Sequence, residues 1–182
     1  MQTTSMTDRL APTRQIALLL AGVGVLTVSS YVAVPMVPVP VTMQTLSVLL
    51  VGALAGPRMG LAMIVSWLAL AAFGLPVLSG GKAGLLAFTG PTAGFLLAFP
   101  VAGYLAGIAA RTIARGHVSR FASFLGLHGL ILLAGWAWLS TLVGAEAAFL
   151  AGVAPFLVGA VIKSALAAAI IAAIPSRYRQ RG

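Results

Sequence analysis

Cysteine is absent from this 182-residue sequence, which excludes disulfide bonds, thiolate metal sites and thiol nucleophiles. Acidic residues are almost as scarce, because Asp8 and Glu146 are the only 2 in the chain. Charged residues make up 7% of the sequence, whereas a soluble domain of this size carries roughly a quarter. The surface of the folded chain must therefore face something other than water, and the composition predicts an integral membrane protein.

Catalytic motifs are missing as well. The sequence contains no Walker phosphate-binding motif, no HExxH zinc motif and no serine–histidine–aspartate arrangement, so we expect no enzyme activity, no catalytic residues and no metal or cofactor site. Transporters that couple to protons or sodium ions usually carry acids inside the membrane, and the apolar segments have none. The energy for any transport should therefore come from a partner protein.

Positive charge is present, with a formal net charge of +9, but its placement argues against nucleic acid as a partner. The arginines lie between or outside the apolar runs and form no continuous basic face with interleaved aromatic residues. The polar stretch 1–15 does not resemble a cleavable signal peptide, because the apolar run after it lacks a convincing cleavage site.

Apolar residues make up 60% of the chain and gather in six segments. A membrane helix needs about 20 residues, so this length allows at most six or seven spans. The Gly56-Pro57-Arg58 turn separates two segments that would otherwise form one long helix. The sequence predicts an all-α bundle of six transmembrane helices over residues 16–34, 44–55, 59–73, 92–110, 121–143 and 153–174.

Arginine placement predicts the orientation of this bundle. All the arginines fall on one side of the membrane if there are six spans, and the other side holds only Lys82 and Glu146. The positive-inside rule then places both termini in the cytoplasm. We expect a cytoplasmic tail over residues 1–15, one transmembrane substrate-binding domain over 16–174, and a basic cytoplasmic tail over 175–182.

Two loops on the outer side are apolar yet contain residues that break helices. The first carries Pro35, Pro38 and Pro40, which favour extended backbone. The second, 74–91, is rich in glycine and still apolar in its middle. Apolar backbone outside helices is tolerated near the bilayer only when protein buries it or when it lines a cavity. We therefore expect the loops to cap a ligand pocket, rather than to be ordinary connections.

Lys163 is the strongest candidate for a binding residue, because it lies near the middle of the last span. A lysine at that depth costs about 3 kcal/mol and marks a functional site by default. Snorkelling to the membrane surface is the alternative, but Lys163 lies about ten residues from either end of its span and its stem is shorter than that. Its counter-charge would be Glu146, if the last outer loop dips inward, or the acid group of a ligand.

Several other residues are weaker candidates. Hydrogen bonds to a small ligand are expected from Gln44, Thr45, Ser79, Lys82 and Thr89, but each alone is weak evidence, because polar side chains at helix starts are usually caps. His128 has no partner at metal-ligand spacing and is predicted to be a packed, hydrogen-bonded residue. Trp136 fits either a pocket wall or an anchor at the membrane surface. Ala17 and Ala21 have the spacing of closely packed helices, which also arises by chance in an alanine-rich chain.

Motifs along nearly the whole chain, from about residue 17 to residue 168, resemble the biotin-specific substrate-binding subunits of energy-coupling-factor vitamin transporters. The motifs are residues 38–46 (PVPVTMQTL), Gly56-Pro57-Arg58 with Gly60, Gly80-Gly81, 90–96 (GPTAGFL), 103–107 (GYLAG), and Pro155-Phe156 followed by Lys163. Together these motifs are specific, although no single one would be.

The resemblance implies a subunit that captures biotin near the outer face of a prokaryotic cell membrane. It also implies partners, namely a transmembrane coupling subunit, which Ala17 and Ala21 would contact, and two cytoplasmic ATPases. Lys163 matches the family lysine and would hold the biotin carboxylate. Polar groups of the outer loops would hold the ureido ring. Phe88, Trp136 and Phe156 would form apolar walls.

Two positions depart from the family pattern. Ala160 stands where an aspartate usually precedes the lysine, which leaves recognition of the ureido ring less defined and Lys163 freer to hold the acid tail. Phe95 stands where the family usually has tyrosine. The alternatives to a capture subunit are a facilitator or channel that works without ATPases, and a structural membrane subunit, which would leave Lys163 unexplained.

Overall fold

The computed structural model describes residues 12–113 and 116–174. Most of the predicted N-terminal tail and all of the predicted C-terminal tail therefore lie outside the described residues. Helices dominate the described part, with one small antiparallel sheet in which Ala33 pairs with Thr42 and Val34 with Val41. The elements are α1 (Pro12–Tyr31), β1 (Ala33–Val34), β2 (Val41–Thr42), α2 (Gln44–Ala55), α3 (Pro57–Ala72), α4 (Ala93–Thr112), α5 (His117–Val143), α6 (Ala145–Gly152) and α7 (Leu157–Ala173), with 3₁₀ turns η1 (Ser79–Gly81), η2 (Leu85–Phe88) and η3 (Ala154–Phe156).

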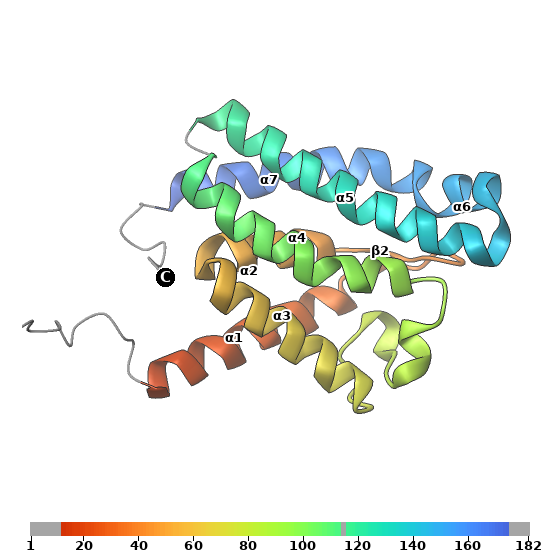
Figure 1. Cartoon of the computed structure of the whole chain (residues 1–182), viewed down its shortest axis with the longest axis horizontal. Coiled ribbons are helices and arrows are strands. Elements are labelled where there is room, and N and C mark those ends of the chain that lie inside the picture. The colour runs from red at the N-terminus through yellow and green to blue at the C-terminus, as the bar shows by residue number, and fades with distance from the viewer. Residues whose placement is uncertain (1–11, 114–115, 175–182) are drawn as a thin grey trace, which may run out of the picture.

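The long helix α4 runs through the middle of the bundle, between α5 on one side and α2 and α3 on the other (Figure 1). Helix α7 packs against α5 and α2, and α1 packs against α2 and α3. The start of α1, the α2–α3 turn and the end of α7 lie at one end of the bundle, which we call the termini end (Figure 1). The opposite end, with β1, β2, η1 and η2, is the loop end.

Glycine lets α2, α3 and α4 approach one another at backbone distance. A Cβ atom added to Gly52 would collide with the carbonyl group of Gly103, and one added to Gly107 would lie 2.5 Å from the backbone nitrogen of Pro57. Gly56, with φ of +88°, ends α2, and Pro57 begins α3 directly after it. The turn predicted from the sequence is therefore confirmed, and it is packed against α4.

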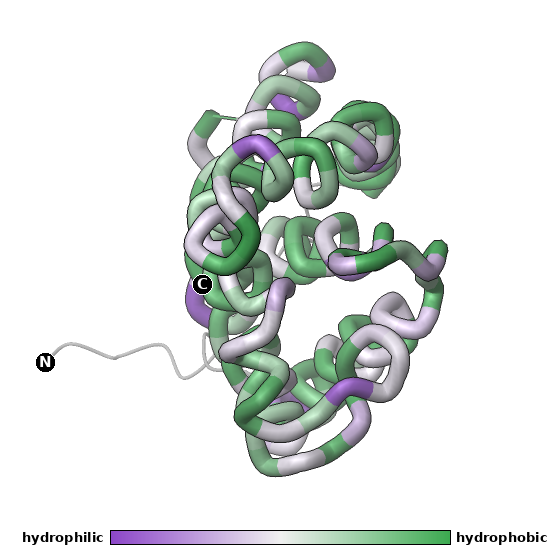
Figure 2. Tube along the Cα trace, turned by 90° about the vertical axis from the view of Figure 1, so that its right-hand side faces the viewer, coloured by the Kyte–Doolittle hydropathy of each residue, from purple (hydrophilic) through white to green (hydrophobic). Residues whose placement is uncertain are grey.

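The outer surface of the bundle is apolar. Hydrophobic residues dominate the helices along their length (Figure 2), and large ones are exposed on several of them, including Leu20 on α1, Leu97 on α4, Leu133 on α5 and Ile162 on α7. A helix that is hydrophobic all round is buried in protein or in lipid. Four helical stretches are long and apolar enough to cross a membrane, Pro12–Tyr31, Ala93–Thr112, His117–Val143 and Ala145–Ala173, while Gln44–Ala55 and Pro57–Ala72 are shorter. The chain is accordingly a multi-pass membrane protein.

Several span boundaries differ from the sequence prediction by a few residues, and two of these differences have a clear physical reason. The first helix ends at Tyr31 rather than at Val34, because the β-branched residues before Pro35 favour extended backbone, and Ala33–Val34 form a strand. The sequence predicts a loop containing Glu146 before the last span. That segment is the helix α6 instead, since its sequence, AEAAFLAG, consists largely of good helix formers and places the acid in the first turn.

Candidate functional site

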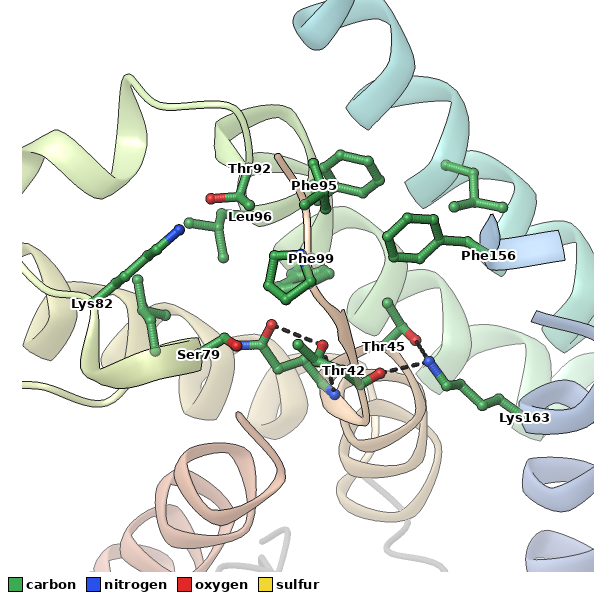
Figure 3. A pocket seen from close by; sticks show the side chains of 15 residues that line it. Thr42, Thr45, Ser79, Lys82, Thr92, Phe95, Leu96, Phe99, Phe156 and Lys163 are labelled. Atoms are coloured by element: carbon green, nitrogen blue, oxygen red, sulfur yellow. Dashed lines mark hydrogen bonds between the residues drawn. The ribbon is translucent and has the colours of Figure 1, made fainter. Parts of the chain in front are cut away.

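A pocket lies at the loop end, where the loops over residues 32–43 and 74–91 meet α4 and α7 (Figure 3). Its empty space, including the open mouth, is ≈ 590 Å³. A mostly apolar lining is interrupted by a few polar groups. The lining consists of Val39, Pro40, Thr42, Gln44, Thr45, Leu78, Ser79, Lys82, Thr92, Phe95, Leu96, Phe99, Leu132, Phe156 and Lys163.

Lys163, in the middle of α7, points inward and is only 9% exposed. Its ammonium donates one hydrogen bond to the backbone carbonyl oxygen of Thr42 at 2.5 Å and one to the hydroxyl oxygen of Thr45 at 3.4 Å (Figure 3). An ammonium carries three N–H groups, so one is left for a further acceptor. The lining residues include no acid. Within the pocket, this buried cation therefore lacks a counter-charge from the protein.

Gln44 is held by hydrogen bonds on both sides of its carboxamide. The Thr42 hydroxyl donates to Oε1 of Gln44 at 3.1 Å, and Nε2 of Gln44 donates to the Ser30 hydroxyl oxygen at 2.9 Å. Ser30 in turn donates to the carbonyl oxygen of Leu26 at 2.7 Å. These bonds connect the pocket to α1, and all the polar residues in them are buried.

Aromatic rings form an apolar wall of the pocket. Phe95 and Phe99 are one turn apart on α4, and Phe156 lies in η3 beside them (Figure 3). The rings of Phe95 and Phe156 are stacked with centroids 6.1 Å apart, and Phe99 is stacked on the buried Trp67 at the same distance. The wall therefore combines residues that are far apart in the sequence.

The loop over residues 74–91 is anchored to the helices beneath it. The indole N–H of Trp67 donates to the carbonyl oxygen of Val77 at 3.1 Å, and the Tyr31 hydroxyl donates to the carbonyl oxygen of Pro76. Trp67 is fully buried on α3, while Tyr31 ends α1. The loop is consequently fixed to two helices, just before the residues that face the pocket.

Ser79 and Lys82 bring polar groups from this loop to the mouth of the pocket (Figure 3). The backbone between them has positive φ at Gly80 (67°) and Gly81 (71°), a conformation that glycine adopts without strain. Lys82 is exposed, unlike Lys163. The two lysines approach the pocket from opposite sides, with Phe99 between them (Figure 3).

The structure brings together most of the residues that the sequence analysis selected for binding. Six of them line the pocket, namely Gln44, Thr45, Ser79, Lys82, Phe156 and Lys163. The other three, Phe88, Thr89 and Trp136, are not lining residues. Thr89 is exposed and donates to the carbonyl oxygen of Leu86 at 3.3 Å. The indole N–H of Trp136 donates to the carbonyl oxygen of Ala145 at 3.0 Å, which ties α5 to α6.

The sequence analysis missed the face of α4 that lines the pocket. Thr92, Phe95, Leu96 and Phe99 are spaced at i, i+3, i+4 and i+7, which places them on one face of a helix. That spacing was available in the sequence, but core residues of a membrane helix show the same pattern. Thr42 was also missed, because its backbone carbonyl group, which no side-chain pattern reveals, is what contacts Lys163.

Two expectations about polar residues have different outcomes. Within the part of the chain that the structure describes, no ion pair joins Glu146 to Lys163, because Glu146 is exposed at the start of α6 and Lys163 contacts Thr42 and Thr45. His128 is buried and hydrogen-bonded, as predicted, through Nδ1 to the Phe124 carbonyl oxygen at 3.0 Å and the Ser164 hydroxyl at 2.9 Å.

Ala17 and Ala21 lie on an exposed face of α1. The same helix also exposes large apolar side chains, with Leu20 63% and Val28 67% exposed. The small residues therefore do not contact another helix of this chain in the described structure. This face is accessible to lipid or to another membrane protein.

Comparison with known families gives a match over nearly the whole chain. The family model described as "BioY family" matches residues 1–180. Sequence relatives carry the same family name. A protein of Pyrococcus horikoshii named "Probable biotin transporter BioY" is 37% identical over 157 residues, which cover 86% of this chain and 93% of the relative. The "Biotin transporter BioY" of Rhizobium etli is 36% identical over 152 residues, covering 78% and 81% respectively.

A solved structure has the same fold. It is described as the S-component for biotin from an ECF-type ABC transporter, and it aligns with 96% of this chain and 96% of its own length at a TM-score of 0.79. The sequence identity in this alignment is 24%, so this likeness establishes the arrangement of the helices.

Proposed function

The chain belongs to the BioY family, and on this basis we propose that it is the membrane-embedded subunit that captures biotin and takes it up. It binds biotin at the outer face and delivers it inward together with an ATP-driven coupling module. The family is a transporter family, so the chain is a transport subunit and not an enzyme. Biotin is its transported ligand rather than a cofactor.

The proposed topology has six spans and two cytoplasmic termini in a prokaryotic plasma membrane. At 1.5 Å per residue, the 12 residues of α2 and the 16 of α3 extend about 18 and 24 Å, less than the roughly 30 Å of the hydrocarbon core. Both helices contact α4. The first loop leads into α2 and the second loop follows α3, so each loop extends its helix at the loop end. Arginine placement supports this orientation, because Arg14, Arg58, Arg111 and Arg120 all lie near the termini end.

The observation that carries the proposed binding mode is the buried ammonium of Lys163 in a pocket without an acid. A carboxylate is the ligand group that best offsets such a charge, and biotin carries one. Lys163, with Thr45 beside it, is proposed to hold the carboxylate, while Gln44 and Ser79 hold the ureido ring. Ala160 supports this division, because an aspartate at that position would give Lys163 an acidic neighbour one turn away on α7.

The proposed partners are a transmembrane coupling subunit and two cytoplasmic ATPases. The chain has no nucleotide-binding motif and no acid inside the described helices except Glu146, which is exposed. The exposed Ala17 and Ala21 are proposed to contact the coupling subunit, since small residues allow helix backbones to approach closely. A facilitator that works alone is the alternative function, and family membership does not favour it.

Uptake of labelled biotin into proteoliposomes separates the two functions. Vesicles that contain this chain, the coupling subunit and both ATPases should accumulate biotin only when ATP is inside. Vesicles with this chain alone should bind biotin without accumulating it. Equilibration of biotin across vesicles that hold only this chain would show a facilitator, and a folded chain that does not bind biotin would exclude both.

A further inference from the structure

The carboxamide of Gln44 faces the pocket with a fixed order of donor and acceptor. A glutamine side chain has an oxygen and a nitrogen of nearly the same size, so its orientation is decided by its neighbours. Gln44 is 6% exposed and has two polar neighbours, Ser30 on α1 and Thr42 on β2. One of these neighbours accepts a hydrogen bond from Gln44 and the other donates one to it.

Ser30 acts as an acceptor toward Gln44. Its hydroxyl proton is donated to the carbonyl oxygen of Leu26 at 2.7 Å, so its oxygen accepts the N–H of Gln44 at 2.9 Å. Thr42 acts as a donor, because its hydroxyl proton goes to Oε1 of Gln44 at 3.1 Å. Turning the carboxamide over would place two oxygen lone pairs against each other at Ser30, unless both hydroxyl protons moved as well. Since Ser30 is 0% exposed, water does not compete for it.

One N–H and one lone pair of the Gln44 carboxamide remain after these bonds are made. A carboxamide has two N–H groups and two acceptor lone pairs, and Ser30 and Thr42 use one of each. The remaining N–H and lone pair are complementary to a group that carries an acceptor next to a donor. A cyclic urea is such a group, because its C=O accepts and its N–H donates. We propose that Gln44 reads the ureido ring of the ligand and that Ser30, which does not line the pocket, is the residue that positions it.

This inference rests on the proposed function, because it takes biotin as the ligand. It adds Ser30 as a positioning residue and a preference of the site between two related ligands. A urea offers an acceptor and a donor side by side. The cyclic guanidinium of protonated 2-iminobiotin offers donors only, so its edge would meet the N–H of Gln44 donor against donor. The site should therefore prefer biotin to 2-iminobiotin, and the preference should depend on the order that Ser30 imposes.

Ser29 provides a matched control for Ser30. Both serines are buried on α1 and both donate to the carbonyl oxygen of Leu26, but only Ser30 contacts Gln44. Purified variants should be compared by titration calorimetry with biotin and with 2-iminobiotin, and their folding checked by thermal unfolding. We expect Ser30→Ala to weaken biotin binding about 3- to 10-fold, the usual effect of one lost hydrogen bond, and Ser29→Ala to change it less than twofold.

Two further variants separate a positioning role from a structural one. In a Gln44→Met background, Ser30→Ala should cause no further loss of affinity, because the group it positions is gone. Gln44→Glu replaces the N–H donor with an acceptor, and it should reduce the preference for biotin over 2-iminobiotin at least tenfold. Ser30→Thr keeps the hydroxyl group and should retain the wild-type preference for biotin over 2-iminobiotin.

Three results would overturn this assignment. Equal effects of Ser30→Ala and Ser29→Ala would show that the hydroxyl group of Ser30 serves only the helix. Additive losses in the double variant with Gln44→Met would show the same. Unchanged selectivity in Gln44→Glu would remove Gln44 from recognition of the ring. Failure of the folded wild-type chain to bind biotin would instead overturn the proposed function, and this inference with it.

Discussion

Lys163→Met tests the charge that the proposed binding mode requires. Methionine is close to lysine in length and apolar, so the variant removes the ammonium without leaving a buried charge. The biotin carboxylate then loses its charge-assisted hydrogen bond from the ammonium, which is worth about 1.5–3 kcal/mol. Because 1.4 kcal/mol corresponds to a factor of ten, biotin should bind roughly 10- to 150-fold more weakly. Removal of the donor to the Thr42 carbonyl oxygen adds to this effect.

Comparing biotin with its uncharged amide isolates the carboxylate in the same titration assay. The wild-type chain should bind biotin more tightly than the amide, and in Lys163→Met this difference should largely disappear. Ile162→Met is the matched control, since Ile162 is adjacent on α7 and 62% exposed. The reasoning would be refuted if Lys163→Met weakened both ligands equally, because Lys163 would then not distinguish the carboxylate, or if it weakened neither.

Three further variants test the mouth of the pocket, the partner face and the packing. Lys82→Gln should lower biotin affinity up to about fivefold at low ionic strength and less at high salt, whereas Arg58→Gln, at the termini end, should have no effect in the same titrations. Ala21→Trp should abolish co-purification of the coupling subunit but leave biotin binding unchanged, and retained co-purification would remove α1 from that interface. Gly52→Ala should destabilise the chain by about 1–3 kcal/mol in thermal unfolding, because its Cβ would collide with α4, while Gly126→Ala, with open space around it, should stabilise by about 0.5–1 kcal/mol.

The positions of the helices could be predicted from the sequence, because apolar length locates membrane helices. The orientation that arginine placement indicates stays a prediction. The break between α2 and α3 at Gly56-Pro57 could also be predicted, because neither residue continues a helix easily. Helix α6 was not anticipated, because glycine at position 144 and an acid at 146 also fit a surface loop, and helix propensity decides only once the segment is packed against α5.

The candidate site was half readable. Lys163 stood out because a buried charge is costly, and Gln44 and Thr45 because they are polar residues at a helix start. Phe95 and Phe99 were hidden, since an apolar residue facing a pocket and one facing the core look alike in a sequence. The role of Ser30 depends on a proton already committed to Leu26, which only the folded geometry reveals.

The hydrogen bond between Lys163 and Thr42 joins residues 121 positions apart, so the ribosome adds the donor long after the acceptor. At about 5–20 residues per second, Lys163 is added roughly 6–24 s after Thr42. During that interval the carbonyl group of Thr42 has no ammonium from which to accept a hydrogen bond. The charged end of the pocket thus assembles only when the last helix enters the membrane, so a prematurely terminated chain would lack it.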